Sequence, residues 1–457
     1  MNLSNKLCRI LNSIVAAGGK PMIVGGAVRD FIMGTDSADC DVEVYGMCAD
    51  KLAATIRPFG SVCEVGKAFG IVKLRSEGEE FDFSLPRTEN KVGIGHKDYN
   101  VAVDPFMSPR AAAARRDFTM NSVYYDYIEG VVVDHYYGGE AIASKLLEPT
   151  SKAFKEDSLR ILRGMQFAAR FDMFASACCV NYATIMKAEY SALPKERVWK
   201  EWEKWAKGDY PQAGLQFLFD CNWTKLYPEL YALVGCQQDP IWHPEGDAYV
   251  HTLYVCDAMA RILNREKIVG EQRTILMMAA LCHDFGKATT TEFIDGRWRS
   301  RGHCEAGVPL AESFLNSIGA PNAIIDKVKP LVAEHLTHVR EEHTARGVRR
   351  LALRLQPATI NELLLLIEAD MNGRPPLPEG LPQQAIDLRN IADSLDLKFN
   401  EPKPIIMGRH LIEAGYKPGV EMGALLKLLF SAQLNGEFAT VEEGLAMIES
   451  IAGKVMP

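Results

Sequence analysis

The stretch Met22-Ile23-Val24-Gly25-Gly26-Ala27-Val28-Arg29-Asp30 decides the fold of the first part of this 457-residue chain. Its apolar start predicts a buried strand, and the glycine pair turns the chain into a helix. Glycine has no Cβ, so backbone N–H groups at such a turn can approach a phosphate closely. The stretch therefore predicts a strand–turn–helix unit with an anion-binding site at the turn.

Two aspartates follow this unit, in Asp39-Cys40-Asp41, and the second begins the strand-like run Asp41-Val42-Glu43-Val44-Tyr45. Residues two apart on a strand point to the same face, so the carboxylates of Asp39 and Asp41 converge. Paired carboxylates beside a phosphate-binding turn are what Mg²⁺ needs to bridge a protein and a triphosphate. A solvated acidic strand start is the alternative, and the neighbouring glycine pair favours the magnesium site.

The composition is that of an ordinary globular protein, with 47% hydrophobic and 24% charged residues. No run reaches the roughly 18 apolar residues of a membrane span, and residues 1–20 lack a signal-peptide cleavage site. Eleven scattered cysteines without a Cys-x-x-Cys pair suit a reducing compartment, so we expect a cytoplasmic protein. The net charge of −8 argues against a protein that coats DNA, and neither DNA nor a membrane is an expected partner.

The chain is too long for one core, and its pattern changes near residue 147. Strand-like and helical segments alternate before this point, whereas everything after it is expected to be helical. A proline-rich break, Arg374-Pro375-Pro376-Leu377-Pro378, precedes the last segment. We predict an α+β fold with a catalytic head at 1–147, a helical region at 148–235, a histidine-rich helical domain at 236–374 and a helical tail at 375–457.

Four further motifs accompany the opening one. They are Arg87-Thr88-Glu89 with the glycine-rich stretch to His96, Arg115-Arg116-Asp117-Phe118-Thr119-Met120-Asn121, Glu156-Asp157-Ser158-Leu159-Arg160-Ile161-Leu162-Arg163 and Glu196-Arg197-Val198-Trp199. In order and approximate spacing, the set resembles the class II tRNA nucleotidyltransferases, the CCA-adding enzymes of the polymerase-β-like superfamily. The resemblance covers residues 21 to about 205 and implies a polymerase-β-like nucleotidyltransferase head.

The resemblance implies roles for the residues around the glycine turn. Asp39 and Asp41 would be catalytic and hold Mg²⁺, which activates a tRNA 3′-hydroxyl and neutralises the pyrophosphate leaving group. Contacts to the triphosphate would come from Gly26, Arg29 and Arg116. Asp82, on a neighbouring predicted strand, is a candidate third carboxylate.

Asp157 and Arg160 would choose the base, with Arg163 beside them on the same helix. In the family an Asp and an Arg on one helix face stand in for a template base. A carboxylate can accept from an exocyclic amino group while a guanidinium donates to the ring nitrogen, a pattern that cytosine and adenine share and uracil and guanine lack. Residues three apart are neighbours on a helix, so Asp157 and Arg160 suit this role, with Arg163 reaching the triphosphate or bracing Asp157. A helix cap with ion pairs is the alternative.

Seven of the ten histidines lie between His243 and His343. Their pattern resembles the HD superfamily of metal-dependent phosphohydrolases, and the metal ligands it implies are His251, His283, Asp284 and Asp370. Two-metal members supply further ligands where His303 and His335 stand. Imidazoles mixed with carboxylates suit a divalent transition metal such as Ni²⁺ or Mn²⁺, without excluding Mg²⁺, whereas a histidine on an apolar helix is more often simply packed.

The segments His243-Pro244-Glu245-Gly246-Asp247 and Ala369 to Arg374 resemble the HD domain that some bacterial CCA-adding enzymes carry. The resemblance therefore reaches residue 374. It implies an enzyme that adds CCA to tRNA from CTP and ATP, with an HD domain that removes cyclic or terminal phosphates from RNA ends or nucleotides.

Other functions stay open at this stage. Poly(A) polymerases share every motif of residues 21–205, although the stretch from Arg87 to Tyr99 favours a CCA-adding enzyme. A partial enzyme that adds only CC or only A fits equally. From a different class, the head could sense nucleotides for an HD hydrolase, but a sensor has no need of the pair Asp39 and Asp41. The sequence leaves the oligomeric state open.

Overall fold

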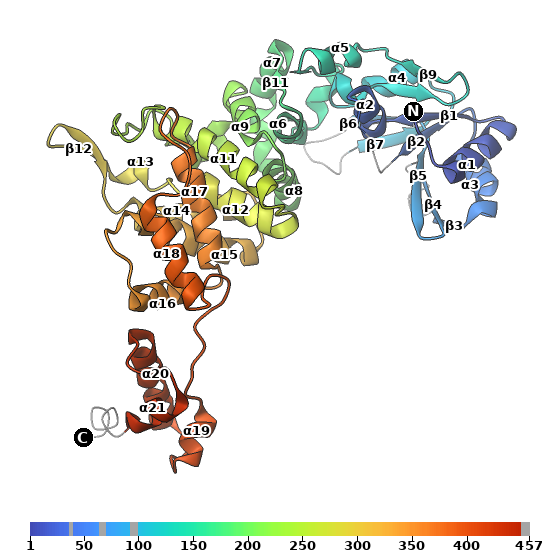
Figure 1. Ribbon diagram of the computed structural model, residues 1–457. Coiled ribbons are helices and arrows are strands. Elements are labelled where there is room, and N and C mark those ends of the chain that lie inside the picture. The colour runs from blue at the N-terminus through green and yellow to red at the C-terminus, as the bar shows by residue number, and fades with distance from the viewer. Residues whose placement is uncertain (36–39, 64–69, 92–98, 449–457) are drawn as a thin grey trace. The chain divides into compact units, whose positions relative to one another are not determined.

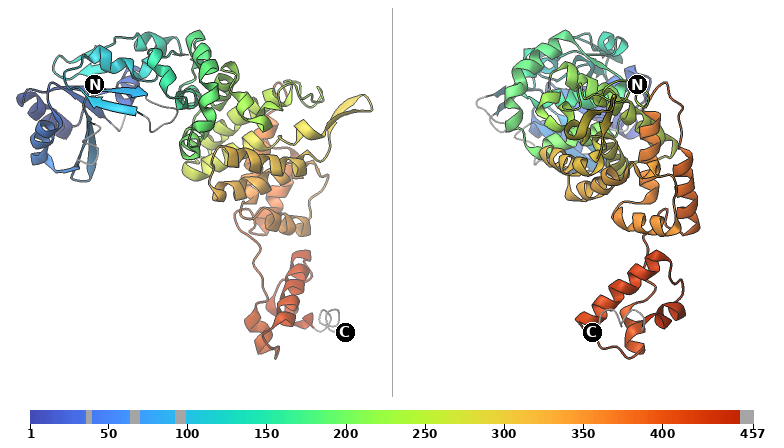
Figure 2. Two further views of the ribbon diagram at one scale, coloured as in Figure 1. Left: turned by 180° about the vertical axis from the view of Figure 1, so that it is seen from behind. Right: turned by 90° about the vertical axis from the view of Figure 1, so that its left-hand side faces the viewer.

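The computed structural model describes residues 1–35, 40–63, 70–91 and 99–448. The chain forms two compact units, Met1–Lys225 and Leu226–Pro457 (Figures 1 and 2). Asp39 and the glycine-rich stretch at 92–98 lie outside the described residues. Within the described ranges, no helix is long and apolar enough to cross a membrane.

A seven-stranded mixed sheet forms the core of the first unit, in the order β3-β4-β5-β2-β1-β8-β9. Its strands are β1 (Lys20–Val24), β2 (Asp41–Tyr45), β3 (Ser61–Cys63), β4 (Ile71–Ser76), β5 (Glu79–Ser84), β8 (Tyr124–Asp126) and β9 (Val131–Val133). The pair β2–β5 is parallel, with Val42 opposite Phe83, and the other pairs of this sheet are antiparallel. A separate hairpin joins β6 (Arg87–Lys91) to β7 (Tyr99–Val103).

The opening stretch folds as its sequence predicts. β1 is buried on both faces, because Met22 and Val24 pack with Ala112 and Ala113 while Ile23 packs on the opposite side. Gly25 then turns the chain with φ 70°, a left-handed conformation that favours glycine, and α2 (Gly26–Ile32) follows.

Short helices surround this sheet. Their bounds are α1 (Asn5–Ala16), α3 (Ala49–Ile56), η1 (Arg57–Phe59), α4 (Pro109–Ala114), η3 (Thr119–Asn121) and α5 (Gly138–Ala143). Apolar residues of α1 and α3 form one core cluster with β2, β4 and β5. This cluster fixes the position of β2, the strand that begins at Asp41.

The helical part of the first unit packs around α6. Its elements are β10 (Leu146–Leu147), η4 (Lys152–Glu156), α6 (Leu159–Phe171), β11 (Phe174–Ala175), α7 (Ala177–Met186), η5 (Lys187–Ala192), α8 (Lys195–Ala206) and α9 (Pro211–Asp220). A Cβ on Gly164 would lie 2.3 Å from Phe217 Cζ, so glycine is required where α6 meets α9. From α8, Trp202 and Trp205 are fully buried with their rings edge to face. α6 and α8 are thereby held at a fixed spacing.

The second unit is mostly helical. Its elements are η6 (Thr224–Leu226, at the boundary), α10 (Pro228–Tyr231), α11 (Ala248–Arg265), α12 (Gly270–Cys282), α13 (Lys287–Thr290), β12 (Thr291–Ile294), β13 (Arg297–Ser300), α14 (His303–Ser317), α15 (Asn322–Glu334), η7 (Thr337–Val339), α16 (Ala345–Arg354), α17 (Ile360–Asn372), α18 (Gln383–Ser394), α19 (Gly408–Glu413), α20 (Val420–Asn435) and α21 (Val441–Ala446). α12 is buried from Arg273 to Cys282 and lies against α11, α15 and α17. The last three helices have a core cluster of their own.

The expectation that everything after residue 147 is helical is wrong at two places. β10 and β11 form a short parallel pair, and β12 and β13 form a hairpin that projects from the helices of the second unit (Figure 1). The hairpin turns at Asp295-Gly296, both with positive φ (53° and 78°). An Asp-Gly pair between two strand-forming runs is a strong hairpin signal, so this element was predictable.

Candidate functional site

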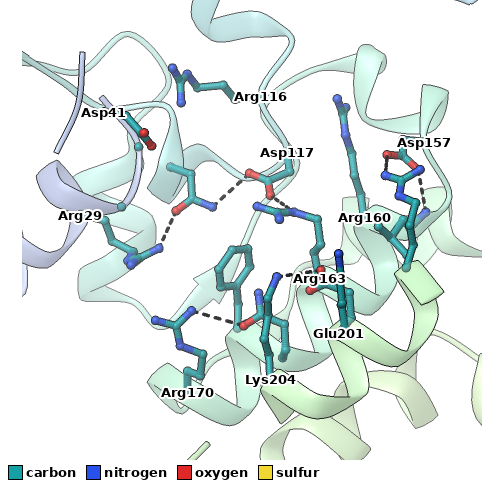
Figure 3. Close-up of a pocket in the computed structure, with 18 of the residues that line it drawn as sticks. Arg29, Asp41, Arg116, Asp117, Asp157, Arg160, Arg163, Arg170, Glu201 and Lys204 are labelled. Atoms are coloured by element: carbon teal, nitrogen blue, oxygen red, sulfur yellow. Dashed lines mark hydrogen bonds and ion pairs between the residues drawn. The ribbon is translucent and has the colours of Figure 1, made fainter. Parts of the chain in front are cut away.

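A cavity of about 970 Å³ lies beside the glycine turn in the first unit (Figure 3). Every described residue that the sequence predicted to bind nucleotide lines it: Gly26, Arg29, Arg116, Asp157, Arg160 and Arg163. The lining also includes the predicted metal ligand Asp41 and the further cations Arg87, Arg115, Arg170, Arg197, Lys200 and Lys204. So many guanidinium and ammonium groups on one cavity suit a polyanion such as a triphosphate.

Asp41 stands at the mouth of the turn. It begins β2 and is exposed. A Cβ placed on Gly25 would lie 3.4 Å from Arg116 Nη1 and 3.9 Å from Asp41 Oδ2, so the glycine lets a carboxylate and a guanidinium approach the same backbone. Because Asp39 lies outside the described residues, its pairing with Asp41 stays a prediction.

Asp82 lies on the other side of Asp41. Both line a second cavity of about 670 Å³, and Asp82 does not line the arginine-rich one. Lys73 Nζ lies 3.0 Å from Asp82 Oδ2 in an ion pair. Its role as a third carboxylate stays a prediction.

Arg29 lies in the floor of the arginine-rich cavity. It is 5% exposed, and its guanidinium donates to Asp30 Oδ1 (2.6 and 2.8 Å) and to Asn121 Oδ1 (2.9 Å). The same guanidinium stacks on the ring of Phe171, with 4.4 Å from Cζ to the ring centroid. Arg29 is therefore a fixed positive charge rather than a mobile one.

Asn121 links Arg29 to Asp117 and, through Asp117, to Arg163. Its Nδ2 donates to Asp117 Oδ1 at 3.0 Å, and Arg163 Nε donates to Asp117 Oδ2 at 2.7 Å. Burial raises the pKa of Asp117, but the charge of Arg163 and the bonds from Asn121 and Phe118 N outweigh it and hold the pKa below the ordinary value. Arg163 is thus held by Asp117 and does not brace Asp157, which corrects one of the two contacts expected for it.

Asp157 and Arg160 are not paired with each other. Asp157 is extended and lies just before α6; its Oδ1 accepts from Leu159 N (3.0 Å) and its Oδ2 from Arg197 Nη2 (2.9 Å). Arg160 donates to the carbonyl oxygens of Ala153 (2.8 Å) and Arg115 (2.7 Å). The expectation that both lie on one helical face is wrong, because α6 begins only at Leu159.

Several residues of this cavity were not assigned to nucleotide binding from the sequence. Asp117 and Asn121 stand inside a quoted motif, but their role as connectors depends on a contact with α6, which is distant in sequence. Arg170 and the α8 residues Lys200, Glu201 and Lys204 also line the cavity. Glu201 is 4% exposed and holds Lys204 Nζ at 2.9 Å. The sequence carries no signal of this burial, which depends on how α8 packs in the fold.

In the second unit, the four predicted metal ligands come together. His251 is on α11, His283 and Asp284 follow α12, and Asp370 is on α17. His251 Nε2 lies 3.1 Å from Asp370 Oδ1 and 3.6 Å from Asp284 Oδ2, and His283 Nε2 lies 3.2 Å from Asp284 Oδ2. All four are buried. Neither Nε2 makes a hydrogen bond within the described residues, although carboxylates are near.

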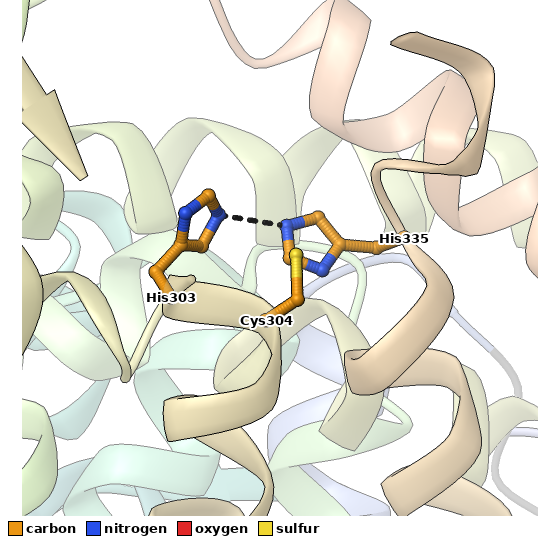
Figure 4. Close-up of side chains that lie close together, drawn as sticks. All are labelled: His303, Cys304 and His335. Carbon is orange, nitrogen blue, oxygen red and sulfur yellow. Dashed lines mark hydrogen bonds between the residues drawn. The ribbon is translucent and has the colours of Figure 1, made fainter. Parts of the chain in front are cut away.

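A second group adjoins the first through Asp284. Asp284 Oδ1 lies 3.4 Å from His303 Nε2 and 3.8 Å from His335 Nε2. The two Nε2 atoms face each other at 3.2 Å, with Cys304 beside them (Figure 4). Burial raises the pKa of the Cys304 thiol to about 12, so the sulfur keeps its proton at neutral pH in the absence of a cation.

Three of these imidazoles have their orientation fixed by the backbone. Each Nδ1 contacts the carbonyl oxygen three residues earlier: His283 to Ala280 (2.8 Å), His303 to Ser300 (2.6 Å) and His335 to Val332 (2.7 Å). A carbonyl only accepts, so Nδ1 carries the proton and the Nε2 lone pair points into the cluster. Facing lone pairs at 3.2 Å repel each other unless a proton forms a hydrogen bond between them or both bind one metal cation. The donor set fits a divalent transition metal.

Glu245 fixes the orientation of the His251 imidazole through its Nδ1 atom, as backbone carbonyls do for the other three rings. Its fully buried carboxylate oxygen Oε1 lies 2.7 Å from His251 Nδ1 and 2.9 Å from His243 Nδ1. Burial raises the pKa of Glu245, but these two bonds outweigh it and lower the pKa to about 2. A carboxylate on the far nitrogen of a ligand histidine raises its basicity toward a metal. Glu245 stands in the motif His243-Pro244-Glu245-Gly246-Asp247, but its role toward His251 was not predicted from the sequence.

The pKa values of His251 and His335 are shifted in opposite directions. Burial lowers the pKa of His251, but Asp370 and Glu245 outweigh it and raise the pKa to about 9. Burial, with repulsion from His303 and His283, lowers the pKa of His335 to about 3. A cation bound at this cluster would replace the proton that the carboxylates favour on His251.

Comparison with known proteins matches both parts of the chain. Residues 21–148 match the family of the poly A polymerase head domain, and residues 248–376 match the HD domain. The crystal structure of the Bacillus stearothermophilus CCA-adding enzyme in complex with CTP is similar, with a TM-score of 0.66 and 20% identity over 99% of each chain. The Thermotoga maritima CCA-adding enzyme complexed with tRNA has a TM-score of 0.61 and 15% identity, over 99% of this chain and 96% of that chain. A complex of a CCA-adding enzyme with ATP has a TM-score of 0.64 and 17% identity, over 98% and 94% of the two chains.

The first unit therefore carries a nucleotidyltransferase head of the poly A polymerase type, and the second carries an HD domain. The chain joins these two domains in one polypeptide and shares its fold with CCA-adding enzymes along almost its whole length. The domain combination and the α+β fold predicted from the sequence are both confirmed.

Proposed function

We propose that this protein is a tRNA nucleotidyltransferase that adds the 3′-terminal CCA from CTP and ATP without a nucleic-acid template. The observation that carries the proposal is the cavity in which the glycine turn, Asp41 and the arginines of three helices meet. We further propose that the HD domain hydrolyses phosphoesters, either 2′,3′-cyclic phosphates or 2′-phosphates.

For the transfer step, Asp39 and Asp41 are the residues that would hold Mg²⁺. Bound there, Mg²⁺ would neutralise the pyrophosphate leaving group and lower the pKa of the attacking 3′-hydroxyl. Arg116 and the backbone at Gly26 would bind the triphosphate, and Arg29, held by Asp30 and Asn121, would supply a fixed charge below it. Positioning and electrostatic stabilisation then provide most of the acceleration.

Base choice falls to Asp157 and Arg160 in this proposal. Their polar atoms already bond to Arg197 and to two backbone carbonyls. A cytosine or adenine would take the place of these partners, because it presents both the amino donor and the ring-nitrogen acceptor that the two side chains need. Uracil or guanine would present a carbonyl to the carboxylate, leaving the two side chains without matching partners.

The similar structures include complexes of CCA-adding enzymes with CTP, with ATP and with tRNA. Their nucleotides are those that the cavity of this chain suits, and this supports the proposal for CCA addition over poly(A) synthesis.

Sequencing of product ends tests the transfer reaction. The full-length protein is incubated with tRNA ending before CCA and with CTP and ATP, each alone and combined. We expect CC with CTP alone and CCA with both. A homopolymer of A, or addition limited to CC or to A, would instead assign a poly(A) polymerase or a partial enzyme. No addition would favour the nucleotide-sensing alternative.

Asp157→Ala and Arg160→Ala test the base choice. Losing one good bidentate contact removes roughly 1–3 kcal/mol of discrimination, so UTP and GTP should be incorporated more often relative to CTP and ATP. Arg110→Ala, a change of an exposed arginine that does not line the cavity, is the matched control. Unchanged rejection of UTP and GTP would show that these two residues do not read the base.

For the HD reaction, His251, His283, Asp284 and Asp370 would hold the metal, and His303 and His335 could hold a second one. A bound divalent metal would supply an activated water near neutral pH. Metal-dependent release of phosphate from adenosine 2′-phosphate by the full-length protein tests the assignment, with Ni²⁺, Mn²⁺ and Mg²⁺ compared at matched concentrations.

A further inference from the structure

A cavity of about 640 Å³ adjoins the histidine cluster, and two kinds of side chain line it: metal-ligand residues and tryptophans. Asp284, His303, His335 and Asp370 lie at the floor. Indole rings line the walls, one from Trp242 in the loop before α11 and one from Trp298 on β13. A metal alone needs no aromatic wall, and the volume lies in the ordinary range for a small-molecule site.

The hairpin is fastened to this loop rather than free of it. Arg297 Nε donates to Asp239 Oδ2 at 2.6 Å, and Thr291 Oγ1 lies 3.5 Å from Cys236 Sγ. Lys287, at the base of the hairpin, donates to Gln238 Oε1 at 2.7 Å. These contacts hold the elements that carry the two tryptophans beside the metal-ligand cluster.

The two tryptophans are not packed as a core would require. Trp242 is 58% exposed, and Trp298 is half-buried with its ring 5.0 Å from that of Phe293, edge to face. Phe293 does not line the cavity and is 61% exposed, so it supports Trp298 from the hairpin side. Half-exposed rings on a charged cavity suit a planar ligand that is exchanged with solvent.

Positive and negative side chains both line the cavity, and Arg297 and Lys287 are paired with Asp239 and Asp284. Arg299 and Arg374 line it together with Lys287. Lys287 Nζ is 2.6 Å from Asp284 Oδ2, whereas the guanidinium of Arg299 makes no hydrogen bond or ion pair with any residue that the structure describes. A phosphate at the cluster would therefore lie among cations, with the tryptophans beyond it.

We propose that this cavity is a nucleoside-phosphate site in which Trp242 and Trp298 stack on the base while the phosphate lies at the histidine cluster. The inference rests on the proposed hydrolase function and assigns the two residues that would hold the base of its substrate. Stacking is tolerant of base identity because every base has a π face, so the site accepts all four nucleosides. A phosphoester without a base is a poor substrate.

A comparison of substrates with and without a base tests this. The full-length protein with Ni²⁺ is assayed on adenosine 2′,3′-cyclic phosphate, on an RNA oligonucleotide ending in a 2′,3′-cyclic phosphate, and on glycerol 1,2-cyclic phosphate. For Trp242→Ala and Trp298→Ala we expect kcat/KM on the base-containing substrates to fall by roughly 5- to 150-fold, with no change on the glycerol compound. The two base-containing substrates show whether a free nucleotide or an RNA end is preferred.

Two control variants distinguish the loss of base stacking from a general disturbance of the fold. Ile241→Ala changes a neighbouring exposed side chain that does not line the cavity and should leave every substrate unchanged. Trp298→Phe keeps a π face and should restore most of the activity. Equal losses on all three substrates, or a wild-type protein that treats them alike, would overturn the nucleoside site.

A binding measurement keeps the proposal testable if no hydrolysis occurs. Titration of adenosine 2′-phosphate, with ribose 5-phosphate as the probe without a base, is compared between wild type and Trp298→Ala. Binding that requires the base and weakens in the variant would support the site while the hydrolase proposal fails. Binding unaffected by Trp298→Ala and Trp242→Ala would overturn it.

Discussion

The arginine-rich cavity of the first unit and the histidine cluster of the second both contain many ionisable side chains. They differ in whether these side chains have hydrogen-bond partners within the protein. In the cavity, two central cations already have protein partners, since Arg29 has Asp30 and Asn121, and Arg163 has Asp117. In the cluster, buried imidazole nitrogens such as His251 Nε2 and His283 Nε2 make no hydrogen bond within the described residues. A buried polar atom without a partner is costly. Arg29 and Arg163 are therefore already held by protein groups, whereas the two imidazole nitrogens of the cluster suit a cation.

Asp41→Ala gives the largest expected effect and tests whether the two sites are separate. It should reduce nucleotide addition by roughly 1,000-fold or more, because the metal position is lost. Phosphate release by the HD domain should stay within about threefold of wild type. Glu129→Ala, an exposed carboxylate away from the cavity, is the control. Addition within about tenfold of wild type would show that Asp41 is not a catalytic ligand.

His283→Ala is the reciprocal change. It removes one ligand from the cluster and should abolish metal-dependent phosphate release, by roughly 100-fold or more. Nucleotide addition should persist within about threefold, which a primer-extension assay on tRNA measures. His410→Ala, on α19, controls for loss of a histidine as such. Loss of addition in a normally folded His283→Ala protein would mean that the two units share one active centre.

Metal removal should separate the two units in a thermal melt. A ligand that binds only the folded state stabilises it by about 2.7 kcal/mol at 100 times its Kd. We expect Ni²⁺ or Mn²⁺ added to chelator-treated protein to raise the transition of the second unit and to leave that of the first unchanged. A uniform shift of both transitions would contradict the contrast drawn between the sites.

Glu245→Gln tests whether the charge of Glu245 strengthens metal binding by His251. The amide keeps the shape of the carboxylate but loses the charge that raises the basicity of His251. We expect metal affinity to fall by roughly 10- to 100-fold in an equilibrium titration, with an unchanged fold. Gln237→Glu, in the neighbouring loop, controls for a change of charge nearby. Unchanged affinity would make Glu245 a packing residue only.

The smallest expected effect concerns Asp117 in the first unit. A carboxyl whose folded pKa is depressed stabilises the fold at pH above its unfolded value, here 3.8, and loses that contribution as the pH falls through the lower folded value. The melting temperature of the first unit should therefore decline below about pH 4, and Asp117→Asn should flatten this decline. Each kcal/mol corresponds to about 2–4 °C for a unit of this size. An identical pH profile in wild type and Asp117→Asn would show that the ion pair with Arg163 contributes nothing.

Local patterns determined what could be predicted from the sequence. The strand, the Gly25 turn and α2 depend on residues close together in the chain, so they were predicted correctly. His251, His283, Asp284 and Asp370 were recognised through their resemblance to a family, and the structure brings them together. Hairpin β12–β13 was missed although its Asp-Gly turn was visible, because helical periodicity in the surrounding segments dominated the interpretation.

Contacts between distant segments could not be predicted in the same way. Asp117 and Arg163 are 46 positions apart, and each had several chemically reasonable partners. The placement of Asp157 depended on whether α6 begins before or after Ser158, and helix ends are the least certain part of any sequence-based prediction. Glu245 stood in a quoted motif, but only its burial shows that its charge is directed at two imidazoles.

The chain of contacts from Asp30 through Arg29, Asn121 and Asp117 to Arg163 joins α2 to α6 without a break in hydrogen bonding. The glycine-turn end of the cavity and α6 are thus joined by one continuous set of contacts. For protein engineering, this means that α6 cannot be exchanged by itself. A chimera that takes residues 148–225 from a relative would have to supply an arginine for Asp117, or Oδ2 of this buried carboxylate would lose its ion pair and keep only the bonds that Oδ1 accepts.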